Sequence, residues 1–327
     1  MKDLIENFPG QLREAIRIGE EATLSSAKRK ISNVFVSGLG GSGIGGTIVS
    51  ELVALEATVS INVSKGYFIP KYINENTLVI ISSYSGNTEE TLNCLNLALK
   101  RKAKIVCITS GGKVAEIAKK KKLDVILIPG GNPPRACLGY SLTQLFFILG
   151  FHKIITNKFK AQLKSSIELI EAEKQCIISE ANEVADKIFG KTPMIYATTY
   201  FEGIAVRFRQ QINENAKMLC GHHVIPEMNH NELVGWANGS ERISVIIFRD
   251  KDEFERNNAR IEINKEVMRK YTPNITEIWS KGKSQIEKAI YFIHLGDWIS
   301  LFLAEKRGVD AVEVKVIDML KGELSKI

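Results

Sequence analysis

Several features that would identify a membrane, secreted or zinc-binding protein are missing from this chain of 327 residues. No apolar run reaches the roughly 18 residues that a membrane span requires, and the N-terminus, MKDLIENFPGQL, lacks the apolar segment of a signal peptide. The five cysteines include no Cys-x-x-Cys pair, which indicates small core side chains in a reducing compartment rather than a disulfide or zinc framework. We therefore expect a cytoplasmic protein with no membrane partner.

The charge also lacks the features of a nucleic-acid-binding protein. A net charge of +7 favours anionic partners without naming one. The basic runs at 28–30 and 119–122 contain no interleaved aromatic residues, so solvated helix faces are preferred over nucleic-acid binding. The hydrophobic and charged fractions, 44% and 25%, are those of an ordinary globular protein, and the length favours two domains.

Short β-rich runs alternate with helical patterns in the first half of the chain. The expected strands are 33–38, 77–83, 103–110 and 123–130. The expected helices lie near 42–55, 88–100 and 112–121. Continuous Val/Ile runs flanked by helices are typical of strands buried on both faces, so the fold class is α/β with a parallel sheet between two helical layers.

The second half repeats this organisation after a long polar helix pattern at 158–189. Its expected strands are 193–200, 243–250 and 275–282, followed by an apolar helix at 286–308. The segment VFVSGLGGSGIGG aligns approximately with IYATTYFEGIAVRF, and LVIISSYSGNTEET with VIIFRDKDEFERNN. The second copy keeps the strands but lacks the hydroxyls. We expect domains at 1–152 and 153–327, with a ligand anchored in the first and the second closing over it.

The turn SGLGGSGIGG, residues 37–46, is suited to an anion. Its six glycines surround Ser42, and they allow backbone N–H groups at a helix N-terminus to approach a ligand closely. This turn contains no Gly-Lys-Ser/Thr and so is not a Walker motif. The Gly-x-Gly-x-x-Gly spacing admits a dinucleotide, but the next β-rich run, 58–68, does not end in the acidic residue that such a site requires. The alternative is close helix–strand packing.

A second loop, within VIISSYSGNTEETL at 79–92, contains more small polar residues than helix capping requires. Asn87 and Glu90 fit a capping box, which leaves Ser83, Ser85 and Thr88 unexplained. Hydroxyls at the carboxyl end of a parallel strand donate to phosphate oxygens, each charge-assisted bond contributing about 1.5–3 kcal/mol. Together with Gly41 and Ser42, these residues predict a phosphate site at the sheet edge. Serines without a lysine clamp fit a sugar phosphate better than a nucleotide.

These two loops are similar to those of the sugar isomerase (SIS) domain of phosphosugar-binding proteins. Three further motifs are GGNPPRACLGY (130–140), NENAK (213–217) and PEMNHNELVGW (226–236). In order along the whole chain, the five motifs resemble the bifunctional phosphoglucose/phosphomannose isomerase family. The resemblance implies two tandem SIS-type three-layer α/β/α domains with mainly parallel sheets. It also implies interconversion of glucose 6-phosphate and mannose 6-phosphate with fructose 6-phosphate.

Such an isomerase opens the sugar ring and moves a proton between C2 and C1 through an enediolate. It therefore needs a carboxylate base and a cation for the developing oxyanion. The resemblance assigns these roles to Glu214 and Arg135. On pattern alone, Glu214 lies off the apolar face of its helix and reads as a solvated or capping carboxylate. Arg135 reads as an exposed loop arginine, although Pro133 and Pro134 stiffen that loop.

Ring opening is assigned by the same resemblance to His230, with Lys321 as a second residue. His230 lies in a polar, loop-like segment, and the resemblance implies that it reaches the site from the partner subunit of a homodimer. Lys321 lies on an expected terminal amphipathic helix, where a solvated lysine is the alternative. Zinc ligation is the alternative role for His230, since four possible further ligands are near in sequence: His222, His223, Glu227 and Glu232. No His-x-x-x-His or His-Glu-x-x-His spacing supports it, so we expect neither metal nor cofactor.

Two other functions use similar phosphate loops. A non-catalytic phosphosugar sensor would need the hydroxyl loops without Glu214, His230 and Arg135 together, and would usually carry a DNA-binding appendage. An amino-sugar-phosphate synthase would need a glutaminase domain with an N-terminal cysteine. The sequence favours the isomerase, while the preferred epimer and the strength of the dimer are left open.

Overall fold

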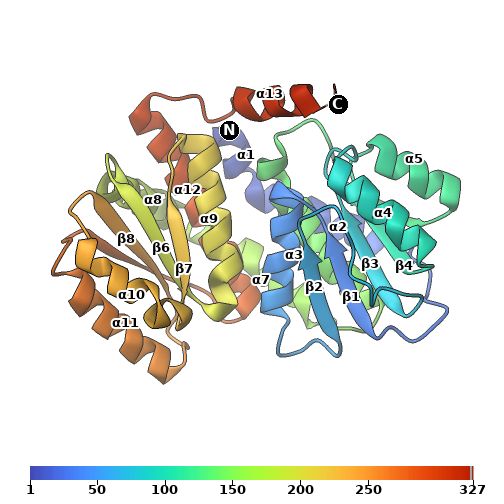
Figure 1. Cartoon of the computed structure of the whole chain (residues 1–327), viewed down its shortest axis with the longest axis horizontal. Helices are drawn as coiled ribbons and strands as arrows, with labels where there is room; N and C mark the ends of the chain where they lie inside the picture. The colour runs from blue at the N-terminus through green and yellow to red at the C-terminus, as the bar shows by residue number, and fades with distance from the viewer. Residues whose placement is uncertain (325, 327) are drawn as a thin grey trace. The chain divides into compact units, whose positions relative to one another are not determined.

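The computed structural model describes residues 1–324 and 326. The chain forms two compact units, each with its own parallel sheet (Figure 1). The first unit comprises Glu6–Ala172 and Lys281–Tyr291, and the second comprises Met1–Ile5, Glu173–Ser280 and the chain from Phe292 on. Two α/β units with parallel sheets confirm the predicted fold class. The domain boundary expected after residue 152 stays a prediction; in the structure the first unit continues to Ala172.

The first sheet has the strand order β2-β1-β3-β4-β5, and all its pairs are parallel. Its strands are β1 (Asn33–Ser37), β2 (Ser60–Ser64), β3 (Thr77–Ser82), β4 (Lys104–Thr109) and β5 (Asp124–Leu127). Every residue of the central strand β3 is buried, as expected for a strand covered on both faces. The four strands predicted for this half of the sequence are confirmed.

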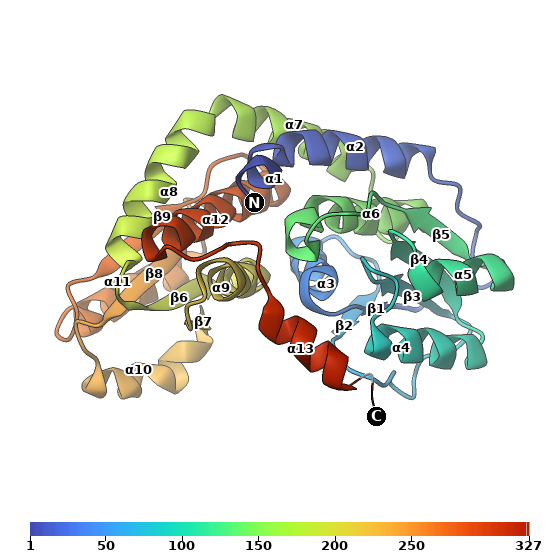
Figure 2. The same ribbon diagram turned by 90° about the horizontal axis from the view of Figure 1, so that it is seen from above.

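Helices cover both faces of this sheet (Figure 2). The face carrying Phe35, Val79 and Cys107 packs against α4 (Glu89–Lys100) and α5 (Gly112–Lys121). The opposite face is covered by α3 (Gly40–Leu52) and α6 (Leu138–Phe151), which contact each other. Two further helices, α2 (Phe8–Glu21) and α7 (Lys158–Ala172), lie outside this layer, and α2 packs on α6.

The second sheet has the parallel order β7-β6-β8-β9. Its strands are β6 (Thr192–Thr198), β7 (Gly221–Ile225), β8 (Ile243–Arg249) and β9 (Ile275–Trp279). One face packs against α11 (Glu255–Met268) and the turns around Trp236, and Phe248 on the other face contacts Phe208 of α9 and Phe292 of α12. The bounds are α9 (Glu202–Ala216) and α12 (Gln285–Arg307). Strand β6 pairs with β7 and β8 as β1 pairs with β2 and β3, in agreement with the internal repeat.

The remaining helices include one departure from expectation. The single helix expected at 158–189 is two, α7 and α8 (Lys174–Ile188), separated at Glu173 without a glycine or proline in the sequence to announce the break. The chain also has α1 (Lys2–Glu6), the short α10 (Glu232–Gly235) and the terminal α13 (Lys315–Leu324). No helix in the described part of the chain combines the length and the apolarity that a membrane crossing requires.

Candidate active site

The glycine-rich turn begins α3 at the carboxyl end of β1. Gly40 has a positive φ of 52°, which glycine adopts without strain. A Cβ on Gly43 would lie 2.3 Å from the carbonyl oxygen of Gly38, so at that position the glycine is required for close helix–strand packing. Gly41 faces another loop, because a Cβ there would lie 3.1 Å from the carbonyl oxygen of Pro134. Packing thus explains some of the glycines, while Gly41 brings α3 against the loop of Arg135.

Ser42 connects this turn to the second hydroxyl loop. Its Oγ accepts a hydrogen bond of 3.0 Å from the backbone N–H of Tyr84, and the serine is buried. A hydroxyl that accepts one bond still has its own proton to donate. The loops that follow β1 and β3 are therefore held together through Ser42, as expected for the ligand crevice at the carboxyl edge of a parallel sheet.

The second loop orders its own hydroxyls. The Oγ of Ser83 and the Oγ1 of Thr88 are 3.0 Å apart and share a hydrogen bond, and the Oγ of Ser85 accepts from the backbone N–H of Asn87. Ser83 is buried and Ser85 is exposed. The predicted capping box is wrong, because α4 begins after Thr88 without a side-chain cap. The side-chain Oδ1 of Asn87 instead accepts from the backbone N–H of Lys113, in the first turn of α5.

Arg135 lies in a 3₁₀ turn, Pro134–Cys137, that leads into α6. It is 3% exposed, so the reading as an exposed loop arginine is wrong. Tyr84 fixes the neighbouring backbone, since its hydroxyl accepts from the N–H of Asn132 at 3.2 Å and from the thiol of Cys137 at 3.3 Å. Burial and the Cys137 contact raise the pKa of Tyr84 to about 12, so this hydroxyl stays protonated at neutral pH.

Three loops of the first unit therefore meet at one edge of its sheet. They carry the predicted phosphate residues and the predicted cation: Gly41, Ser42, Ser83, Ser85, Thr88 and Arg135. Their connections run through Tyr84, which the sequence analysis did not single out. An aromatic residue amid serines and glycines is the only signal that could have drawn attention to it. A buried arginine on a loop that adjoins small hydroxyls and glycine backbone is suited to an anionic oxygen.

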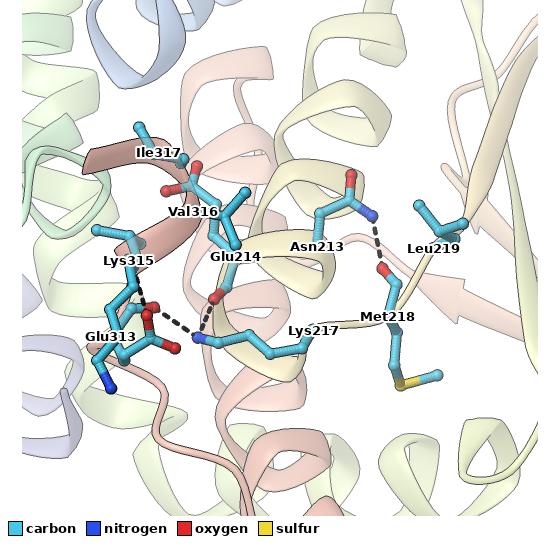
Figure 3. A pocket seen from close by; sticks show the side chains of 10 residues that line it. Asn213, Glu214, Lys217, Met218, Leu219, Glu313, Lys315, Val316 and Ile317 are labelled. Carbon is cyan, nitrogen blue, oxygen red and sulfur yellow. Dashed lines mark hydrogen bonds between the residues drawn. The ribbon is translucent and has the colours of Figure 1, made fainter. Parts of the chain in front are cut away.

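Glu214 lies in the last turn of α9, in the second unit. The apolar stripe predicted for this helix is buried, and Glu214 lies off it and is half-buried. It lines a pocket of about 410 Å³ between the end of α9 and residues 313–317 (Figure 3). Val314, Val316 and Ile317 make part of the wall. The carboxylate is therefore placed beside a partly apolar cavity rather than in open solvent.

Lys217 links the same helix end to the C-terminal segment. Its ammonium group donates to the backbone oxygens of Glu214, Asp310 and Glu313 at 2.7, 2.7 and 2.8 Å. Figure 3 shows the bonds to Glu214 and Glu313. Lys321 lies on α13, whose residues are all exposed. Lys217 was not identified from the sequence, although it closes the NENAK motif.

His230 ends a short 3₁₀ turn, Glu227–His230, that follows β7. Its side chain is exposed, as the loop-like sequence predicted, and it does not line the pocket of Glu214. The neighbouring acids have protein partners: Glu232 accepts from the hydroxyl of Tyr196, and Glu227 from Asn231. Among residues 1–324 and 326, no three His, Cys, Asp or Glu side chains gather as a metal site would require.

Comparison with known families agrees with this architecture. Residues 29–146 match the SIS domain family, and residues 177–324 match the bacterial phospho-glucose isomerase C-terminal SIS domain. A hypothetical protein from Thermus thermophilus has the same fold, with a TM-score of 0.76 at 17% identity over 99% of this chain and 88% of that one.

Two curated proteins are similar over most of their length. The bifunctional phosphoglucose/phosphomannose isomerase of Caldicellulosiruptor bescii is 36% identical over 100% of this chain and 99% of its own. The D-glucosamine-6-phosphate 4-epimerase of Sulfolobus acidocaldarius is 30% identical over 87% of this chain and 86% of its own length. Both SIS domains, the motif order and the full-length similarity agree: the chain belongs to the bifunctional phosphoglucose/phosphomannose isomerase family.

Proposed function

We propose that this chain interconverts glucose 6-phosphate and mannose 6-phosphate with fructose 6-phosphate through an enediolate. The observation that carries this proposal is the meeting of Arg135 with the hydroxyl loops at the carboxyl edge of the first sheet. Membership of the family supports the reaction class, because the relative in Caldicellulosiruptor bescii is named for both activities.

The hydroxyls hold the phosphate in this proposal. Ser42 accepts from Tyr84, so its proton is available to a phosphate oxygen. Ser83 and Thr88 share one hydrogen bond, which leaves one of the two protons for the ligand. Ser85 accepts from Asn87 and is exposed, so its proton too can reach a ligand. Each charge-assisted bond contributes about 1.5–3 kcal/mol.

Glu214 is the proposed base. It removes the proton from C2 of the open-chain aldose, the electron pair forms the C1–C2 double bond, and the carbonyl oxygen at C1 becomes the enediolate oxygen. The proton returns to C1 while the hydroxyl proton of O2 moves to O1, and this leaves the C2 carbonyl of the ketose. Arg135 stabilises the oxyanion. Since the two aldoses are C2 epimers, both give the same enediolate, and reprotonation on either face of C2 connects fructose 6-phosphate to both.

His230 and Lys321 are proposed to open the ring, with His230 supplied by the partner subunit of a homodimer. Its exposed position on a surface turn is compatible with this role. No metal or cofactor has a part in these steps.

The alternative is a phosphosugar sensor that binds with the same loops and does not turn its ligand over. Arg135 discriminates only weakly between the isomerase and the sensor, because a buried arginine can bind an anionic ligand whether or not a reaction follows. Glu214 discriminates better, since a carboxylate beside a phosphosugar repels the ligand and is of use mainly in proton transfer.

The test is incubation of the purified protein with fructose 6-phosphate in D₂O with a chelator, followed by NMR. We expect both aldose 6-phosphates, each with deuterium at C2. Glu214→Gln should slow turnover by roughly 10²–10⁴-fold and still bind the sugar phosphate. One aldose alone would narrow the specificity, and binding without turnover by the unaltered protein would favour the sensor. Glucosamine 6-phosphate is included as a second substrate because of the related epimerase.

A further inference from the structure

We propose that Lys217 is a positioning residue. Its ammonium group holds the segment that carries Lys321 in a fixed position relative to the end of α9, which carries Glu214. The inference rests on the proposed function, because it concerns two residues to which that function assigns roles. Its structural part can be measured without any turnover.

The ammonium group of Lys217 is fully committed to backbone oxygens. It has three N–H bonds, and three carbonyls accept from it within 2.8 Å: those of Glu214, Asp310 and Glu313. One acceptor belongs to the last turn of α9, and the other two to the loop between α12 and α13. A single side chain therefore joins segments that are about a hundred residues apart in sequence (Figure 3).

The position of Lys217 favours this arrangement. It is the left-handed C-cap of α9, with φ 54° and ψ 39°, beyond the last helical residue. The final carbonyls of a helix have no partners within the helix, and a positive charge there is favourable to the helix dipole. Because Lys217 satisfies the Glu214 carbonyl, it restrains the backbone from which the Glu214 side chain projects.

The tether acts directly on the start of α13. Glu313 is one acceptor, and the next residue, Val314, accepts hydrogen bonds from the backbone N–H groups of Ile317 and Asp318. The first turn of α13 is thus fixed one residue beyond the Lys217 contact. Residues 313–317 also line the Glu214 pocket, so their placement sets the wall of that pocket.

The helix α13 itself buries little of its surface. None of the described residues of α13 is buried, and several of its apolar side chains are exposed: Val316, Ile317, Met319, Leu320 and Leu324. A segment with few buried contacts opens easily. The three hydrogen bonds of Lys217 are therefore expected to determine where Lys321 lies.

The chain contains a matched control. Lys122 is the left-handed C-cap of α5, with φ 54° and ψ 44°, and it is exposed. Within the described part of the chain, no residue accepts a hydrogen bond from its ammonium group. Lys122→Met therefore makes the same substitution at the same backbone geometry without removing hydrogen bonds between segments.

The first measurement is amide hydrogen exchange of Ile317 and Asp318. In Lys217→Met, which removes the donors and keeps the chain length, we expect their exchange to accelerate by about tenfold or more. Lys217→Arg, which keeps the donors, should retain part of the protection, and Lys122→Met should leave it unchanged. Unchanged exchange in Lys217→Met would overturn the inference whatever its effect on activity.

The second measurement is the isomerase rate. Lys217→Met should lower kcat roughly 10- to 100-fold with KM altered less than about twofold, since misplacement of a reacting group affects the chemical step. When Lys321 is already replaced by Met, Lys217→Met should lower kcat by a markedly smaller factor than it does in the unaltered protein. Faster exchange with an unaltered kcat would overturn the positioning role. Absence of turnover in the unaltered protein would instead overturn the proposed function, which the exchange result would distinguish.

Discussion

At the scale of single residues, the hydroxyls of the proposed phosphate site also hold their own loops in place. The buried Oγ of Ser42 satisfies the backbone N–H of Tyr84, whereas the exposed Oγ of Ser85 accepts only a longer bond of 3.3 Å from Asn87. Loss of a buried acceptor leaves its donor unpaired, and loss of an exposed one does not, because water replaces it. Binding and stability can therefore be separated by comparing the two serines.

We expect Ser42→Ala to weaken both ligand binding and the stability of the fold, and Ser85→Ala to weaken ligand binding alone. Ser42→Ala should reduce the free energy of unfolding by about 1–3 kcal/mol, because the Tyr84 N–H is left buried without an acceptor. Ser85→Ala should change it by less than about 0.5 kcal/mol. Both should raise KM for fructose 6-phosphate. Urea denaturation and initial rates measure the two effects, and an unaltered unfolding midpoint in Ser42→Ala would contradict this account.

Residue patterns indicated the proposed phosphate loops more directly than the other proposed site residues. Ser83, Ser85 and Thr88 were singled out because they exceed what a helix cap needs. The pattern alone read Glu214 and Lys321 as solvated, and only the family resemblance gave them roles. Tyr84 and Lys217 were not found, because their importance lies in contacts with backbone groups far away in sequence, which no local pattern contains.

At the scale of elements, strands were predicted best. Buried Val/Ile runs gave β1, β3, β4 and β8 to within one or two residues. Helix α6 was not predicted, since all residues from Leu138 to Leu149 are buried and no polar face reveals a helical period. Strand β7, GHHVI, was missed because it is a half-buried edge strand with two histidines.

The carboxyl end of β8 shows why the second copy of the repeat has no phosphate loop. Arg249, the last residue of β8, corresponds to Ser82 at the end of β3, directly before the hydroxyl loop, and is 2% exposed. Its guanidinium bonds to Glu253, Glu277 and Asn258, and stacks 4.5 Å from the ring of Trp279. A network of carboxylates around an internal cation leaves no place for an anionic ligand, so the asymmetry seen in the sequence has a structural cause.

An ion pair between neighbouring strands predicts a pH-dependent stability for the first unit. Lys104 of β4 contacts Asp124 of β5 at 2.6 Å, and the backbone N–H of Ser25 also donates to Asp124. Burial raises the pKa of the Asp124 carboxyl, but the bonds from Lys104 and Ser25 outweigh it and lower the pKa below its ordinary 3.8. A lowered folded-state pKa stabilises the fold above that ordinary value, and the stabilisation is lost as the pH falls through the folded-state pKa.

Asp124→Asn should therefore destabilise the protein at pH 7. The difference in stability between the variant and the unaltered protein should shrink progressively as the pH falls below about 4. The measurement is the difference in urea midpoint between the unaltered protein and the variant across that range. Arg17→Gln, which breaks an exposed pair with Glu21, serves as the control and should have a small effect throughout. A difference that stays constant with pH would show that Asp124 contributes through packing instead of charge.

At the scale of the whole molecule, the proposed use of the partner's His230 makes activity a property of the assembly. If each active site takes Glu214 from one subunit and His230 from the other, then neither Glu214→Gln nor His230→Ala homodimers contain a competent site. A heterodimer of the two variants contains one site with both substitutions and one with neither. Complementation is therefore required by this arrangement and impossible if both residues of a site come from the same subunit.

Mixing the two inactive variants under conditions that exchange subunits should restore activity. Random pairing makes half of the dimers mixed, each with one intact site in two, so we expect about one quarter of the activity of the unaltered protein. Each variant mixed with itself is the control for refolding and exchange. Light scattering establishes whether a dimer forms, and mass spectrometry of isotope-labelled chains establishes whether subunits exchanged. Dimers that demonstrably exchange without regaining activity would assign His230 to the same subunit as its Glu214, and the ring-opening step would then need no partner.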